Sequence, residues 1–270
     1  MIAVATLDMY DLPEIRAATN DWWAAIARHL AAAGLDNVPA ALTRGRPVAV
    51  NWRDPALLLT QTCGYPLTHA HAADLLAIAV PDYRAEGCGG GRYSSAFMVR
   101  ETDPAETLDD MRGRRVAANG PDSQSGCNAL RIAVAMVAAG NDRFFSDVLW
   151  SGAHRRSLAL VRDGQADIAA IDGLSLALVG DVAPHEIAGL RVLDWSPSAP
   201  ALPYAVRADT EPDTRDRVFT GLLEAGEDPH AATARDTLRI AGLLPARNAD
   251  YAVIVRMREA AEEQGYPLLA

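Results

Sequence analysis

The chain has 270 residues, half of them hydrophobic, and a formal net charge of −10. This length predicts one large or two small domains. The acidic balance argues against a nucleic-acid partner or an anionic membrane surface, because either would select a basic face. A small anionic ligand stays compatible with it, since a few local donors can outweigh a negative average.

Segments typical of strands and helices alternate along the chain. In the first half we expect strands at 2–7, 56–60, 75–81 and 95–100, and a helix from Asp21 to Ala33. Further on, strands are expected at 114–119, 166–172, 190–196 and 203–209, with helices at 127–139 and from 154, and a mainly helical pattern after Arg215. This alternation predicts an α/β fold whose sheets are mixed and mainly parallel, with flanking helices.

Two breaks divide this pattern: a glycine-rich stretch at 87–91 and a proline-rich stretch at 196–203. They predict one discontinuous lobe, residues 1–92 plus 200–270, and an inserted lobe, residues 93–199. Two crossings between lobes suggest a hinge, and a hinge suggests a ligand cleft.

Loops that directly follow strands are where open α/β sheets bind ligands. Three such loops supply hydroxyls, aromatic walls or an open backbone, at Tyr10, Thr62, Gly64, Tyr65, Tyr93 and Ser94. The alternatives are an ordinary aromatic residue at a strand end and a tight turn set by Gly64 and Pro66. The glycine-rich loop lacks the G-K-[ST] ending of a phosphate-binding P-loop, so a nucleotide site is not expected there.

The segment DSQSG, residues 122–126, stands where a long apolar helix should begin. A serine or aspartate at this position is a common helix cap, and a cap needs only one side chain. This loop supplies Asp122, Ser123 and Ser125 together, and Gly126 adds an unencumbered backbone. Beside the unpaired N–H groups of a helix start, they predict an anion site.

A second helix start, SGAHRRS at 151–157, offers Ser151, His154 and, one turn further, Ser157. Asp172, which ends the strand ADIAAID, could accept from a ligand or orient another side chain. A lone histidine is more often structural, and Arg155 and Arg156 are more often solvated.

The sequence carries no convincing catalytic residue, because the G-x-S-x-G and H-E-x-x-H patterns are absent. Cys63, Cys88 and Cys127 lack C-x-x-C spacing, so no metal site is expected, and no cofactor either. Cys63 and Cys88 are candidates for a disulfide in an oxidising compartment; three partly buried thiols are the equal alternative.

Several segments together resemble the phosphate/phosphonate-type solute-binding proteins of ABC transporters. They are MYDLPE, QTCGYPL, GCGGGRYSS, RGRRVAANGPDSQSG, the S-x-x-H-x-x-S segment with G-x-A-D-x-A-A-I-D, and APALPY. The resemblance implies the two-lobed type II periplasmic-binding-protein fold, closing on a ligand. It implies that Ser123, Ser125 and Gly126 bind the oxyanion head group with help from Ser151, His154 and Ser157. Tyr10, Thr62, Tyr65, Tyr93 and Ser94 would line the first lobe and the crossover, and Asp172 the far wall.

We therefore expect a solute-binding protein of an ABC-type uptake system, which captures phosphate or a phosphonate in the inter-lobe cleft and works with a permease. The alternatives are an enzyme on the same fold and a cytoplasmic ligand sensor. No apolar run reaches the roughly 18 residues of a membrane span, so direct membrane insertion is not expected. The first residues read as a strand and not as a signal peptide. The location is then cytoplasmic, or periplasmic if a leader has been removed.

Overall fold

The computed structural model describes residues 3–138 and 143–269, which fall into two compact units. Unit 1 contains the described residues up to Arg84, residues 89–91 and residues 200–251. Unit 2 contains residues 85–88, the described part of 92–199, and the chain from Ala252 onward. Three very short strands, β4 (Cys88–Gly89), β5 (Arg92–Tyr93) and β11 (Ala199–Pro200), form a small sheet where the chain passes between units.

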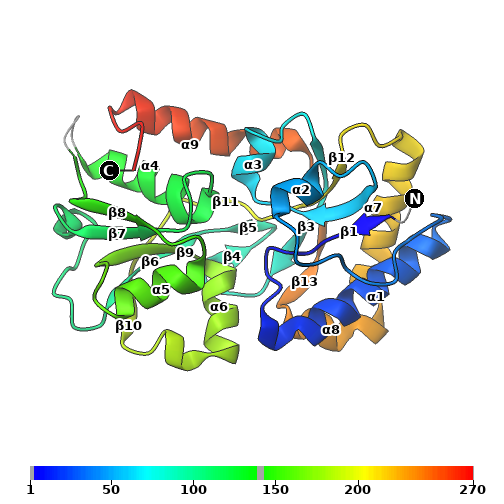
Figure 1. Cartoon of the computed structure of the whole chain (residues 1–270), viewed down its shortest axis with the longest axis horizontal. Helices are drawn as coiled ribbons and strands as arrows, with labels where there is room; N and C mark the ends of the chain where they lie inside the picture. The colour runs from blue at the N-terminus through cyan, green and yellow to red at the C-terminus, as the bar shows by residue number, and fades with distance from the viewer. Residues whose placement is uncertain (1–2, 139–142, 270) are drawn as a thin grey trace. The chain divides into compact units, whose positions relative to one another are not determined.

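Unit 1 is built on a five-stranded sheet with the order β1-β2-β12-β3-β13. Its strands are β1 (Val4–Ala5), β2 (Leu57–Gln61), β3 (Leu75–Tyr83), β12 (Tyr204–Arg207) and β13 (Ile240–Pro245). The helices α1 (Arg16–Ala32), α7 (Pro212–Glu227) and α8 (Ala232–Thr237) pack together, and α7 and α8 also contact β13 (Figure 1). Two short helices, α2 (Val48–Trp52) and α3 (Gly64–Thr68), flank β2 along the chain.

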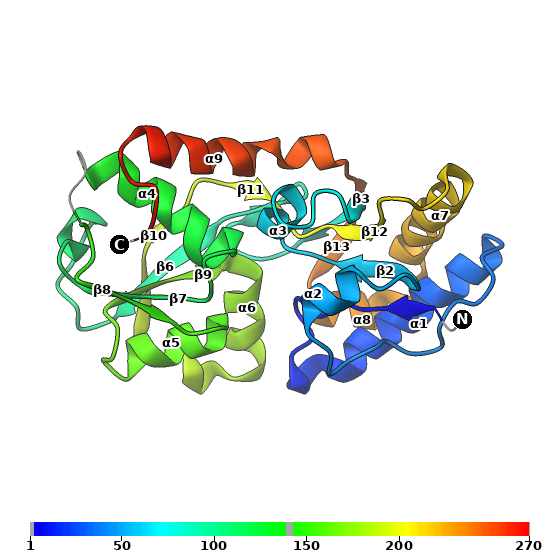
Figure 2. The same ribbon diagram turned by 45° about the horizontal axis from the view of Figure 1, so that its top comes forward.

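Unit 2 is built on a second five-stranded sheet with the order β10-β6-β9-β7-β8. Its strands are β6 (Ser95–Arg100), β7 (Arg115–Ala118), β8 (Asp147–Trp150), β9 (Ile168–Asp172) and β10 (Leu190–Trp195). The helices α4 (Ala129–Ala138) and α9 (Ala252–Glu263) lie along one face of this sheet, and α5 (His154–Arg162) and α6 (Gly173–Val182) along the other (Figures 1 and 2).

The α/β class and the mixed sheets match the expectation, but the share of parallel pairs is smaller than expected. Among the described strands of unit 1, β1 and β2 run parallel, whereas β12 and β13 run antiparallel to their neighbours. In unit 2, β7 is parallel to β8 and β9, while β6 is antiparallel to β9 and β10. The antiparallel strands β6 and β12 each follow a passage of the chain between the units. Because no helical crossover leads into them, they need not run parallel to their neighbours.

Two segments near the C-terminus differ from the sequence expectation. The strand β13 lies within a stretch expected to be helical, and it pairs with β3 at the sheet edge, where Pro245 is tolerated. The helix α9 packs with unit 2, although residues 200–270 were all expected in the discontinuous lobe. The reason is that its apolar side chains Ile254, Met257 and Ala261 are buried and the helix contacts α4. The chain therefore also passes between the units at residues 251–252, where no passage was expected.

Candidate functional site

The helix start at DSQSG lies at the carboxyl end of β7, in unit 2. Ser123 Oγ accepts a hydrogen bond of 3.0 Å from the backbone N–H of Gly126, so Ser123 is the cap. Residues Gln124–Asn128 form a single π-helical turn that leads directly into α4. Such wide turns are frequent at functional sites. The first N–H groups of this turn have no helical carbonyl behind them, as at any helix start.

Asn119, the first residue after β7, fixes how closely this turn can approach the strand. A Cβ atom on Gly126 would lie 1.7 Å from Asn119 Oδ1, far inside van der Waals contact. An alanine at 126 would therefore have to displace the side chain of Asn119. The side-chain oxygen of Asn119 is inaccessible to solvent and makes no hydrogen bond within the described structure.

The two helix starts expected from the sequence meet at a side-chain contact. Ser125 Oγ lies 2.9 Å from His154 Nε2, and Asn119 Nδ2 lies 3.5 Å from the same nitrogen. His154 is the first residue of α5, which follows β8. Because β7 and β8 are parallel neighbours, the loops after them emerge at the same edge of the sheet.

His154 is uncharged at neutral pH. Burial lowers the pKa of the His154 imidazole to about 4, and the backbone carbonyl of Ala170 partly opposes that shift. The neighbouring Arg155 is bonded to Glu186, and Arg156 is exposed. The groups gathered at this helix start are thus neutral side chains and backbone amides.

Ser151 and Ser157 support this arrangement from behind. Their hydroxyl oxygens are 2.7 Å apart, and Ser151 also donates to the Ala153 carbonyl at 3.0 Å. Ser157 is fully buried in this structure and holds Ser151 in place. A direct contact between Ser157 and the ligand stays a prediction.

A buried polar network anchors the same helix to the C-terminal segment of unit 2. Asn128 donates to Gln124 Oε1 at 2.7 Å and accepts from Arg131, which also donates to the Pro267 carbonyl at 2.7 Å. Gln124 contacts Met257 Sδ at 3.4 Å. The polar residues of the turn therefore divide into anchors, which face α9, and Ser125, which faces His154.

The other expected site residues of unit 2 are largely enclosed. Asp172 is 2% exposed and caps α6, accepting from the backbone N–H of Ser175 at 2.9 Å. Tyr93 is buried, and Ser94 is partly exposed with its backbone bonded to Gly87 and Gly173. The helix-capping role of Asp172 was not expected from the sequence.

The expected site residues of unit 1 lie after β1 and β2, whose parallel pairing places them at one sheet edge. Tyr10 packs edge-on against Tyr83, with ring centroids 5.5 Å apart. Tyr65 stacks on His69 at 3.9 Å. Thr62 is fully buried and donates to the Cys63 carbonyl, and Gly64 begins α3.

Two residues near these sites were missed by sequence reasoning. Asn119 ends the strand-like run RRVAAN, and a polar residue at a strand end was the available signal. Asp8 follows β1 and accepts from Asn51 Nδ2 at 3.3 Å. Burial raises the pKa of Asp8, against hydrogen bonds from Thr6 and Asn51.

The structure describes Cys63, Cys88 and Cys127 as thiols, and a disulfide between Cys63 and Cys88 in an oxidising compartment stays a prediction. Cys63 belongs to unit 1 and Cys88 to unit 2, so no packing within one unit holds the two sulfurs together. Across the described residues, no group of three or more His, Cys, Asp or Glu side chains could hold a metal ion.

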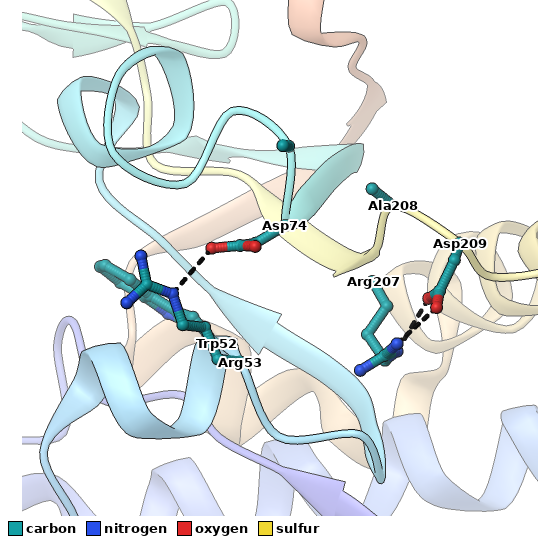
Figure 3. Close-up of a pocket in the computed structure, with 7 residues that line it drawn as sticks. Trp52, Arg53, Asp74, Arg207, Ala208 and Asp209 are labelled. Atoms are coloured by element: carbon teal, nitrogen blue, oxygen red, sulfur yellow. Dashed lines mark hydrogen bonds and ion pairs between the residues drawn. The ribbon is translucent and has the colours of Figure 1, made fainter.

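A pocket of about 340 Å³ lies in unit 1, away from the loops that follow β1 and β2. Arg207, which lines it, pairs with Leu75 at the start of β3, whereas Tyr204 pairs with Gln61 at the end of β2. Figure 3 shows Arg53 turned toward Asp74 and Arg207 toward Asp209, so the charges of the pocket pair with one another. It is lined by none of the residues expected to bind a ligand.

These two α/β units, each a mixed sheet flanked by helices, define the two-lobed fold of periplasmic substrate-binding proteins. The family model for periplasmic phosphonate substrate-binding proteins of ABC transporters matches residues 57–251. The chain belongs to this family. Between residues 3 and 138 and between 143 and 269, no helix is both long enough and apolar enough to span a membrane.

Solved structures share the fold at low sequence identity. The binding-protein component of a phosphonate ABC transporter from Pseudomonas aeruginosa aligns with a TM-score of 0.80 at 14% identity, covering 97% of this chain and 87% of that one. PhnD1 from Prochlorococcus marinus, in complex with methylphosphonate, aligns with a TM-score of 0.75 at 13% identity over 97% and 98% of the two chains. A Xanthomonas citri protein bound to ATP aligns at 0.69 and 17% identity over 98% of each chain. No curated protein sequence matches the chain.

Proposed function

We propose that this family member captures a small oxyanion, a phosphonate or phosphate, at the start of the helix Gln124–Ala138. The observation that carries the proposal is the contact of Ser125 with His154, which brings two helix starts to one point. Backbone N–H groups at a helix start favour an anion electrostatically by about 0.3–1 kcal/mol. Hydrogen bonds to a charged partner, worth about 1.5–3 kcal/mol each, supply the rest.

The protein acts without a chemical step and delivers its ligand to an ABC permease in the periplasm. Family membership supports the transport role. The chemistry of the helix start agrees with simple capture, because burial lowers the pKa of His154 to about 4 and so makes it a weak general base for Ser125. Cys127 is equally unsuited to nucleophilic chemistry, since burial raises the pKa of its thiol to about 11.

Calorimetry and thermal unfolding with methylphosphonate, phosphate, sulfate and common neutral metabolites test the proposal. A ligand that binds only the folded protein stabilises it by about 2.7 kcal/mol at a hundredfold excess over its Kd. We expect this shift with methylphosphonate or phosphate. Stabilisation by a neutral metabolite, with no response to any phosphonate or phosphate, would overturn the proposal.

A further inference from the structure

The hydrogen on the His154 ring determines which groups the helix start presents. His154 Nε2 lies 2.9 Å from Ser125 Oγ and 3.5 Å from Asn119 Nδ2. In the structure the Asn119 amide is assigned with Nδ2 toward the ring; an amide nitrogen carries two hydrogens and cannot accept, so in this orientation Asn119 donates to the ring. A hydrogen on Nε2 would point at this amide group. Nε2 is therefore the acceptor, and the hydrogen of the neutral ring lies on Nδ1.

The surroundings of the ring agree with this tautomer. Burial lowers the pKa of His154 to about 4, so the ring holds a single hydrogen at neutral pH. Nδ1 is inaccessible to solvent, and the Ala170 carbonyl raises the pKa of the ring against the effect of burial. A carbonyl only accepts, and with Nε2 facing Ser125 and Asn119, Nδ1 is the ring nitrogen left to supply the hydrogen.

In this tautomer of His154, the hydroxyl hydrogen of Ser125 is used in the hydrogen bond to the ring. A serine has one hydrogen to donate and lone pairs to accept with. With Nε2 as acceptor at 2.9 Å, Ser125 donates to His154. Ser125 Oγ can therefore only accept a further hydrogen bond. The ligand atom that lies against it must carry a hydrogen.

We propose that Ser125 accepts a hydrogen bond from the ligand, so that the helix start selects an oxyanion that still carries an acidic proton. A monoprotonated phosphonate or phosphate meets this requirement, because its charged oxygens can face the backbone N–H groups while its P–OH faces Ser125. Sulfate, which has the same tetrahedral shape, carries no proton at neutral pH. The inference rests on the proposed function and specifies the form of the ligand.

The charged groups around the pair fit a singly charged ligand. Arg155, on the same helix as His154, is bonded to Glu186, and Asp172, at the end of β9, caps α6. Arg131 of α4 is bonded to Asn128, and Asp122 is exposed at the start of the loop. Removing a second negative charge from water without a bonded cation is costly, so a monoanion is favoured over a dianion.

Calorimetry at about pH 6, near the second pKa of a phosphate ester, separates the two possible roles of Ser125. We expect the wild-type protein to bind methylphosphonate at least about tenfold more tightly than sulfate, the difference that one charge-assisted hydrogen bond produces. In Ser125→Ala, methylphosphonate should weaken by about tenfold or more, while sulfate stays within about threefold of wild type. The exposed Ser146→Ala is the matched control and should bind both anions as wild type does.

Equal weakening of both anions in Ser125→Ala would mean that Ser125 donates to the ligand, and it would overturn the inference. So would equal affinity of the wild type for sulfate and methylphosphonate, although the proposed function would then stand. Binding of neither anion, nor of phosphate, would overturn the proposed function itself.

Nitrogen-15 NMR of the histidine ring in the ligand-free wild-type protein gives an independent answer that needs no variant. We expect a bare Nε2 and a protonated Nδ1 at His154. A hydrogen on Nε2 would overturn the inference, whatever the binding data show.

Discussion

Ser125 Oγ and His154 Nε2 lie 2.9 Å apart although 29 positions separate them in the chain. The contact exists because β7 and β8 are parallel neighbours, so that the helix that follows each strand begins at the same sheet edge. It joins a helix start that was expected to bind an anion to a histidine that burial keeps neutral.

Replacing Gly126 with Ala should force Asn119 away from the helix start. The added Cβ would lie 1.7 Å from Asn119 Oδ1, and overpacking of this kind costs about 1–3 kcal/mol. Urea unfolding should show that loss, and calorimetry should show weaker anion binding. Gly242→Ala is the control, because nothing lies within 4 Å of its new Cβ. Equal stability of the two variants would contradict the close approach of Asn119.

Replacing His154 with Gln should remove part of the pH dependence of stability. Burial lowers the pKa of His154 from 6.5 to about 4, so between these values the unfolded chain binds a proton that the folded chain does not. The contribution of His154 to the free energy of unfolding of the wild type is therefore complete above about pH 6.5. It falls by about 2 kcal/mol between pH 7 and pH 5. Urea unfolding at both pH values should show a smaller loss in His154→Gln than in wild type.

The exposed His185→Gln is the control for this experiment, and it should keep the wild-type slope. A slope in His154→Gln as steep as that of wild type would show that His154 titrates normally.

Replacing Asp167 with Asn should destabilise the edge where β7 and β9 meet the end of β6. Asp167 accepts from Arg100 Nη2 at 2.8 Å and from the backbone N–H of Arg115 at 3.0 Å. Burial alone would raise the pKa of this carboxyl, but the hydrogen bonds from Arg115 and Arg100 outweigh it and hold the pKa well below its usual range. The ionised carboxylate of Asp167 therefore stabilises the folded protein above about pH 4. This stabilisation is lost as the pH falls further, because the carboxylate takes up a proton.

At pH 7 we expect a loss of about 2–4 kcal/mol in Asp167→Asn, less than for a wholly buried pair because both arginines are partly exposed. The difference from wild type should narrow below about pH 4. The exposed Asp163→Asn, which loses only a pair with Arg162, should change stability by less than about 1 kcal/mol. A constant difference at all pH values would exclude the carboxylate charge as the cause.

The three thiols should differ in reactivity in the folded protein. Cys127 is 5% exposed, and burial raises the pKa of its thiol to about 11, so it should resist a maleimide at pH 7. Cys63 and Cys88 are partly exposed and should react first. Mass spectrometry after labelling should find all three cysteines modified once the unreduced protein is unfolded. If two of the cysteines react with the maleimide only after reduction, those two cysteines form a disulfide.

The local features of this protein follow from its sequence. The apolar strands with helices between them predict the α/β fold, because burial patterns and helix caps are set by neighbours in the chain. The serines of DSQSG are an example: Ser123 caps the backbone three residues ahead, so this bond follows from local sequence. The helix expected from residue 154 likewise begins there, at His154.

What those local features do depends on packing between distant parts of the chain. The helix α9 packs with α4 of unit 2, and Asp167 accepts from Arg100 of β6, each through contacts between segments distant in the chain. Strand order sets such contacts, and many orders are compatible with one pattern of strands and helices. The role of Ser125 depends on them most, because its partner His154 reaches it only through the pairing of β7 with β8.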